Sequence, residues 1–176
     1  MKRRALLACS LTLLASVPKL SGATSLDPIY AGVRTIVLHV RIESQERDDA
    51  LLIPREEMQL RLVEFIRSEL SKRSLQIAVT DRNSYVQPRD YPSDWVLWLE
   101  CRFDLATRHL EGESPKTIGV VSVVFQRGED GGRLAGEPFE IFFLEKDDSA
   151  LVTTAETAAK ASLNRDVIDP ITRSNQ

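Results

Sequence analysis

Three apolar segments in the second half of the chain constrain the fold more than any other feature of the sequence. The segments span residues 95–105, 117–126 and 139–145, and each has the composition of a β-strand. They follow one another along the chain, and the connections between them are too short for the crossover helices that parallel strands need. The sequence therefore predicts that the three strands form an antiparallel meander.

The first of these strands also indicates which of its two faces is buried. Side chains alternate between the faces of a strand. The predicted core face carries Trp95, Leu97, Leu99, Cys101, Phe103 and Leu105. The opposite face carries Val96, Trp98, Glu100, Arg102 and Asp104. Since Cys101 is on the apolar face, we expect its thiol to be buried and inert.

The first half of the chain predicts a strand, a helix and a second strand. Residues 34–42 alternate between apolar and polar side chains, as in a half-buried strand. Pro54 is at a favoured helix start, and the predicted helix covers about 55–73. Its apolar stripe consists of Met58, Leu62, Phe65, Ile66 and Leu70. The next short strand is marked by Leu75, Ile77 and Val79.

A last helix follows the meander. Thr153 and Glu156 fit a capping box at its start, small side chains form one face, and Pro170 is expected to end it. The complete order is β-α-β-β-β-β-α. We therefore predict an α+β fold, in which a mixed, mainly antiparallel sheet carries its helices on one face.

The first 23 residues resemble a cleavable secretory signal peptide. A basic start, Met1 to Arg4, precedes an apolar stretch over 5–17, and Ser21-Gly22-Ala23 supplies small residues for cleavage. The apolar stretch is shorter than the roughly 20 residues that span a bilayer. An uncleaved membrane anchor and lipidation at Cys9 are the alternatives. We expect a periplasmic or secreted protein with no membrane span after cleavage.

The predicted mature chain, 24–176, is long enough for one domain. We expect a short flexible lead-in over 24–32 and a C-terminal tail over 170–176. The signal removes four basic residues and no acidic one, so 19 Lys and Arg remain against 26 Asp and Glu, a formal charge of −7. This charge argues against nucleic acid as a partner, because phosphate binding needs a basic surface.

No catalytic, cofactor-binding or metal-binding motif is present in the sequence. His39 and His109 are isolated and have neither Cys partners nor a metal-binding spacing, so we interpret both as surface histidines. Glu100 and Asp104, four residues apart on a strand, would be roughly 13 Å apart, farther than the carboxylate pairs of glycoside hydrolases. With Arg102 between them, they are predicted to form an ion-paired outer face. No cofactor is expected.

A possible recognition surface consists of Tyr85, Tyr91 and Trp98. Both tyrosines are in a long loop over 81–94, and loops of this length are uncommon unless they are functional or disordered. Trp98 is on the polar face of its strand, so the alternatives are that a second helix covers it or that it is an exposed contact.

The segments 35–42, 54–74, 75–79, 95–104, 117–126, 139–145 and 153–167 follow one another as in a group of small bacterial envelope domains. The order resembles that of the amino-terminal domain of TolB and of the domains of the lipoproteins CsgG and LpoB. The resemblance implies a non-catalytic binding or assembly role in the envelope, with a protein or envelope component as the unknown partner. The alternative is a secreted, hydrolase-like enzyme, which a pocket holding His39 or His109 beside a carboxylate would favour.

Overall fold

A single mixed sheet organises the protein. The computed structural model describes residues 27–44, 53–108, 116–128, 131–142 and 148–175. Within them six strands pair in the order β2-β1-β3-β4-β5, and β6 also pairs with β4. The strands are β1 (Thr35–Ser44), β2 (Ala78–Asp81), β3 (Val96–Arg108), β4 (Lys116–Arg127), β5 (Arg133–Ala135) and β6 (Phe139–Phe142). Strand β1 is parallel to β2 and β3, whereas β4 is antiparallel to β3, β5 and β6. The predicted α+β class and the meander are confirmed.

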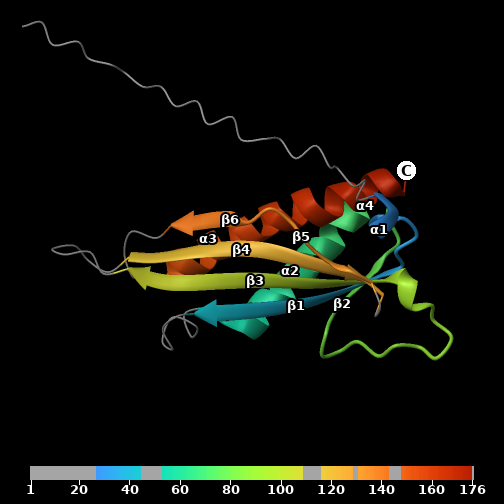
Figure 1. The fold of residues 1–176 in the computed structure, drawn as a ribbon, viewed down its shortest axis with the longest axis horizontal. Coiled ribbons are helices and arrows are strands. Elements are labelled where there is room, and N and C mark those ends of the chain that lie inside the picture. The colour runs from blue at the N-terminus through green and yellow to red at the C-terminus, as the bar shows by residue number, and fades with distance from the viewer. Residues whose placement is uncertain (1–26, 45–52, 109–115, 129–130, 143–147, 176) are drawn as a thin grey trace, which may run out of the picture.

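Two long helices, α2 and α3, lie side by side on one face of this sheet (Figure 1). The helical elements are α1 (Asp27–Tyr30), α2 (Arg55–Lys72), the 3₁₀ turn η2 (Ser93–Trp95), α3 (Asp148–Leu163), the π-helical turn η3 (Asn164–Ile168) and α4 (Asp169–Ser174). No helix among the described residues is long and apolar enough to cross a membrane.

Helix α2 packs on the sheet through the apolar stripe that the sequence predicts. Met58, Leu62 and Ile66 are at most 1% exposed and belong to the same core cluster as Leu38 of β1. Gln59 extends this contact, because its side-chain oxygen accepts a hydrogen bond of 3.0 Å from the backbone N–H of Val40. That N–H lies beyond the end of β2, so the glutamine replaces a strand partner at the edge of β1.

Helix α3 begins five residues earlier than the capping box predicts. Thr153 is inside the helix, which starts at Asp148. The additional turn contains Leu151, which is buried in the core, and this burial stabilises the earlier start. The predicted small-residue face is confirmed: Ala155, Ala159 and Ser162 are fully buried where α3 packs against β4.

Pro170 does not end the last helix, so the predicted tail over 170–176 is wrong for its described residues. Proline lacks an N–H and clashes with the carbonyl four residues before it, which breaks the regular α-helical pattern. The π-helical turn η3 absorbs this break, and Pro170 then occupies the first turn of α4, where proline is tolerated. Pro170 and Ile171 are both buried, so α4 is part of the domain.

The described part of the predicted lead-in is also folded. Tyr30, at the end of α1, is fully buried, and its ring lies 5.8 Å from that of Phe125. Its hydroxyl donates a hydrogen bond to the backbone oxygen of Asp166 in η3. Burial, with the nearby charge of Asp166, raises the pKa of Tyr30 well above its usual value. These contacts join the beginning of the domain to its C-terminal helices.

Trp95, which the sequence predicts to begin the first strand of the meander, lies outside β3. It belongs to η2, where its N–H bonds to Pro92 O at 3.0 Å, and it is 39% exposed. The strand begins one residue later, and from Leu97 to Leu105 the predicted core face is buried. Strand β5 is absent from the sequence prediction, which has a turn ending at Gly132 and the next strand at Phe139.

The burial of Cys101 provides a test of which face of β3 is the core face. Its side chain is fully buried, and burial raises the pKa of the thiol to about 12. Because the thiolate is the reactive form and labelling requires an opening of the fold, we expect a thiol-reactive dye to label native protein at least about 100-fold more slowly than urea-unfolded protein. The labelling rate is measured by dye absorbance. Equal rates for native and unfolded protein would show that the two faces of β3 are reversed.

Candidate functional site

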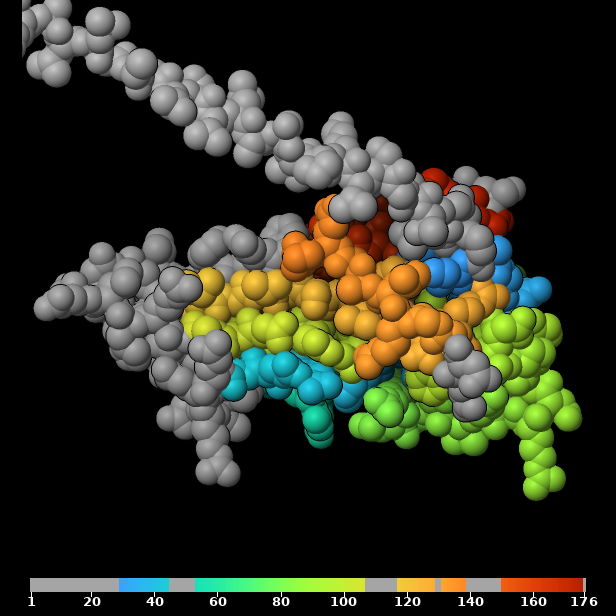
Figure 2. Space-filling view, viewed as in Figure 1, coloured from blue at the N-terminus to red at the C-terminus, as the bar shows by residue number. Residues whose placement is uncertain are grey.

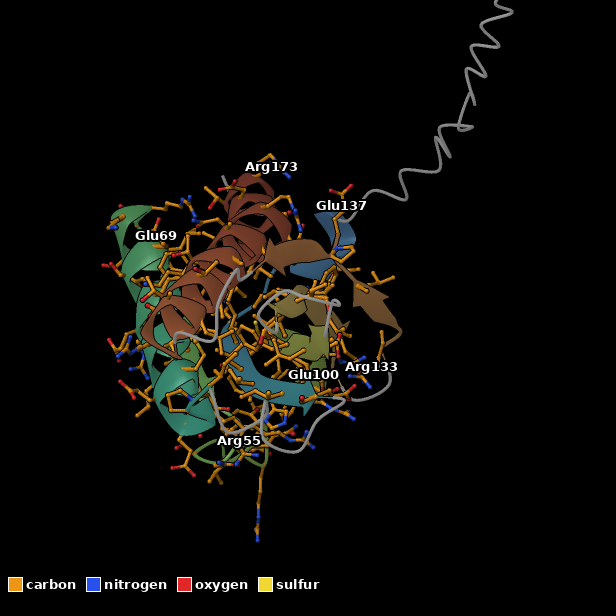
Figure 3. All side chains as sticks on the ribbon, turned by 90° about the vertical axis from the view of Figure 1, so that its left-hand side faces the viewer. Arg55, Glu69, Glu100, Arg133, Glu137 and Arg173 are labelled. Atoms are coloured by element: carbon orange, nitrogen blue, oxygen red, sulfur yellow. The ribbon has the colours of Figure 1, made fainter. Side chains whose placement is uncertain are left out.

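The face of the sheet opposite α2 and α3 carries the polar side chains of the central strands. On β1 and β3 these include His39, Arg41, Trp98 and Glu100, which alternate with the core residues. Figure 2 shows the atoms of β1, β3 and β4 on this face without a helix over them, and Figure 3 shows Glu100 on the side away from the two long helices. We call this surface the open face.

The long loop after β2 folds onto one end of the open face. Asp81 fixes the start of the loop, because its carboxylate accepts hydrogen bonds from the N–H groups of Asn83 and Ser84 at 2.9 and 3.0 Å. The Ser84 side chain also hydrogen-bonds to Asp81. This bond first, and then the backbone hydrogen bonds, lower the pKa of Asp81. Arg82 is the residue directly after β2, and its backbone N–H donates a hydrogen bond to Leu38 O of β1 at 2.9 Å.

The structure brings two of the three proposed recognition residues together. The ring of Tyr85 meets that of Trp98 edge-on, with 5.3 Å between centroids. Trp98 is therefore covered in part by this loop, whereas the two alternatives from the sequence were a covering helix and an exposed contact. Tyr91 is placed differently: its ring packs edge-on against Trp95, and its hydroxyl lies 3.0 Å from the hydroxyl of Thr35.

A hollow of about 460 Å³ opens on this face beside Trp98. Its floor comes from β1, β3 and β4, and its sides from the segment after β2 and from β5. It is lined by His39, Arg41, Arg82, Trp98, Leu99, Glu100, Val124, Phe125, Gln126, Gly128 and Arg133. The volume lies within the range of small-molecule binding sites, about 300–1,000 Å³.

Glu100 is the carboxylate among the described lining residues, and arginines neutralise it. One of its oxygens lies 2.9 Å from Arg102 Nη2 and 3.4 Å from Arg133 Nη2. Burial alone would raise the pKa of Glu100, but the hydrogen bond and charge of Arg102, with the charges of Arg133 and Arg41, outweigh it and lower this pKa. The predicted ion pairing of the outer face is confirmed for Glu100 and Arg102.

The other lining charges are positive. Arg41 pairs with Glu43 at 2.5 Å, whereas Arg82 has no carboxylate within ion-pair distance among the described residues. The pKa of His39 is lowered, first by burial and then by the charge of Arg82, against the opposite effect of Glu100. The hollow is thus electropositive, in a chain whose formal charge is −3.

The opposite end of the open face is acidic. A second hollow of about 390 Å³ there includes Glu43 and Asp104. Burial, and then the neighbouring charge of Glu43, raises the pKa of Asp104. The open face therefore changes from basic beside Trp98 to acidic beside Asp104.

Several candidates from the sequence do not join this site. His109 lies outside the described residues. Cys101 faces the core. Within the part of the chain that the structure describes, no group of three His, Cys, Asp or Glu residues could hold a metal ion.

The arginines of the hollow are the functional candidates that sequence reasoning missed. Arg41 shares the polar face of its strand with His39, and that alternation was a usable signal. Arg82 and Arg133 are far apart in the sequence, and only the sheet order places the end of β2 and strand β5 on either side of the same surface.

No protein-family model and no curated protein matches this sequence. Among solved structures, similar folds include the PelC dodecamer from Paraburkholderia phytofirmans, with 10% identity over 76% of this chain and 88% of that chain and a TM-score of 0.45. Another is a neuraminyllactose-binding hemagglutinin homologue from Helicobacter pylori, with 15% identity, 84% of both chains and a TM-score of 0.45. A minor lipoprotein from Acinetobacter baumannii has 12% identity over 80% of this chain and 91% of that chain, with a TM-score of 0.35. The structural neighbours include a bacterial lipoprotein, while the likeness to TolB, CsgG and LpoB stays a prediction.

Proposed function

We propose that this chain is an exported, non-catalytic binding domain of the bacterial envelope, and that it binds its partner or ligand at the basic end of the open face. The observation that carries the proposal is the hollow beside Trp98, which arginines from β1, β5 and the segment after β2 line together with this aromatic side chain. Charged side chains converging on a concave surface with an aromatic wall are typical of a binding site. The export pattern of residues 1–23 supports the envelope location.

The contrast between the two faces of the domain supports this choice of surface. The other face is covered by α2 and α3, whose outer surface carries local ion pairs such as Arg61 with Glu57 at 2.5 Å and Lys160 with Glu156 at 2.6 Å. Such exposed pairs satisfy one another and are typical of a solvated helix surface. The open face has both a hollow and unbalanced charge.

The proposal is tested by photo-crosslinking in cells that naturally make the protein. A photoreactive residue in place of Gln126, which lines the hollow, is expected to give an adduct of defined mass in intact-protein mass spectrometry. The same residue in place of Ser68, exposed on α2, is the matched control and is expected to give none. Adducts from position 68 alone, or equally from both positions, would contradict the proposal.

A hydrolase-like enzyme is the second candidate, and the position of His39 favours it. His39 is the register partner of Glu100 on the adjacent strand, and both line the hollow. A histidine of lowered pKa is neutral near pH 7 and can accept a proton, while nearby arginines can stabilise negative charge in a transition state. However, no Ser, Thr or Cys is among the described lining residues. If the wild-type protein chemically converts a bound ligand and His39→Asn does not, the enzyme is favoured. If the ligand is recovered unchanged from the wild-type protein, the binding domain is favoured.

A further inference from the structure

We infer that the hollow beside Trp98 binds a small organic anion, in which a carboxylate or phosphate group is attached to a planar or apolar body. Arg82, Arg133 and Arg41 would hold the anionic group, and Trp98 would contact the body. This inference rests on the proposed function, since it names the ligand class of the same site.

The three arginines reach the hollow from three different elements. Arg41 is on β1, Arg82 follows β2, and Arg133 is on β5. Their existing bonds differ: Arg41 has a close carboxylate partner, whereas Arg133 has a longer contact of 3.4 Å, and Arg82 has no carboxylate partner among the described residues. Arg82 and Arg133 therefore have donors available for a ligand. Guanidinium groups bind carboxylate and phosphate through paired hydrogen bonds.

The charge around the hollow selects an anion over a cation. Three arginines line it against Glu100 as the carboxylate among the described lining residues. Glu100 also accepts a hydrogen bond of 2.9 Å from Arg102, so the negative charge is already compensated. A cation would meet uncompensated guanidinium groups, whereas an anion would reduce their mutual repulsion.

The uncharged lining residues indicate what else the ligand carries. Trp98 is half-buried and packs against Tyr85 in a T-shaped contact, and the side chain of Val124 lies on the same face of the sheet. Gln126 donates a hydrogen bond to Gly128 O at 3.1 Å beside them. A fixed aromatic ring next to apolar and amide side chains fits a ring or a short apolar body better than a bare inorganic ion. The volume of about 460 Å³ fits a ligand of that size.

Calorimetric titration of the purified protein with simple probes tests this inference. Phenyl phosphate and benzoate are expected to bind, inorganic phosphate to bind more weakly, and phenol and benzylamine not to bind. Arg82→Gln and Arg133→Gln are each expected to weaken the binding of phenyl phosphate about tenfold or more, because each removes a charge-assisted hydrogen bond. Arg61→Gln, which removes an exposed arginine from α2, is the matched control and should leave the affinity unchanged.

Two further arms separate a free ligand from an anionic group on a larger molecule. Vesicles of phosphatidylcholine with phosphatidylglycerol, and a hexaglutamate peptide, are expected to bind no more tightly than phenyl phosphate. Tighter binding of either that depends on Arg82 would overturn the small-ligand inference, as would equal binding of phenol or an unchanged affinity in both arginine variants. Crosslinks from position 126 with no binding of any anion would refute this inference and leave the proposed function standing. Unchanged thermal unfolding confirms that the variants are folded.

Discussion

Leu62→Ala is expected to lower the free energy of unfolding by about 2–5 kcal/mol, the range for large-to-small changes in packed cores. Leu62 is fully buried at the centre of the apolar stripe of α2, in the core cluster that also contains Ile36 and Leu38 of β1. The truncation removes buried methyl groups and leaves a cavity that the sheet below cannot close. Since domains of this size have a total stability of about 5–15 kcal/mol, the loss is a large fraction of it.

Arg61→Ala is the matched control on the same helix. Arg61 is exposed and bonds to Glu57 and Glu156 at 2.5 and 2.9 Å. Exposed ion pairs contribute little, so this change is expected to leave the free energy of unfolding nearly unchanged. Urea denaturation followed by circular dichroism measures both variants. If Arg61→Ala were as damaging as Leu62→Ala, the outer side of α2 would be a packed surface and the assignment of its faces would be wrong.

The parts of the fold that could be predicted are those where alternating or helical patterns persist over many residues. The core faces of β1 and β3 follow from a two-residue period, and the buried face of α2 follows from its apolar stripe. Short connections indicated the antiparallel meander. In each case burial is repeated at many positions, so the pattern outweighs exceptions such as Val37, which is buried although it is on the polar face of β1.

Elements that depend on tertiary contacts could not be predicted in this way. Strand β5 has three residues, all exposed, so it shows no apolar pattern, and its pairing with β4 defines it. Helix α3 starts early because Leu151 finds space in the core. The loop that covers part of Trp98 does so through Tyr85, a contact between segments that have no local pattern in common.

The residues of the candidate site were likewise predictable only in part from the sequence. The sequence pointed to Tyr85 and Trp98 because aromatic side chains on a loop and on a polar strand face are noticeable in themselves. It did not point to Arg82 or Arg133, because a single arginine in a charged sequence has no distinguishing local feature. Their significance arises from the sheet order, which places both beside the same hollow.

The C-terminal segment provides the second large expected effect. Ile171 of α4 is fully buried, in the same core cluster as Tyr30 of α1. Helix α4 packs against α1, and the side-chain amide of Asn175 donates to Ile171 O at 2.8 Å. Arg73, at the end of α2, reaches Asp169 at 3.0 Å. The segment beyond Pro170 therefore closes one end of the core.

Ile171→Ala is expected to lower the free energy of unfolding by about 2–5 kcal/mol, because it leaves a cavity between α4 and the rest of the core. A chain that ends at Ile168 should lose at least as much, since it removes all of α4 together with its contact to α1. Arg173→Ala, on the exposed side of the same helix, is the control and is expected to cost about 0.5 kcal/mol or less. Urea denaturation of the three proteins distinguishes the two descriptions of this segment. If residues 170–176 were a tail, the shortened chain would unfold at the same urea concentration as the full one; a docked α4 requires a clear shift to lower urea in the shortened chain and in Ile171→Ala, and none in Arg173→Ala.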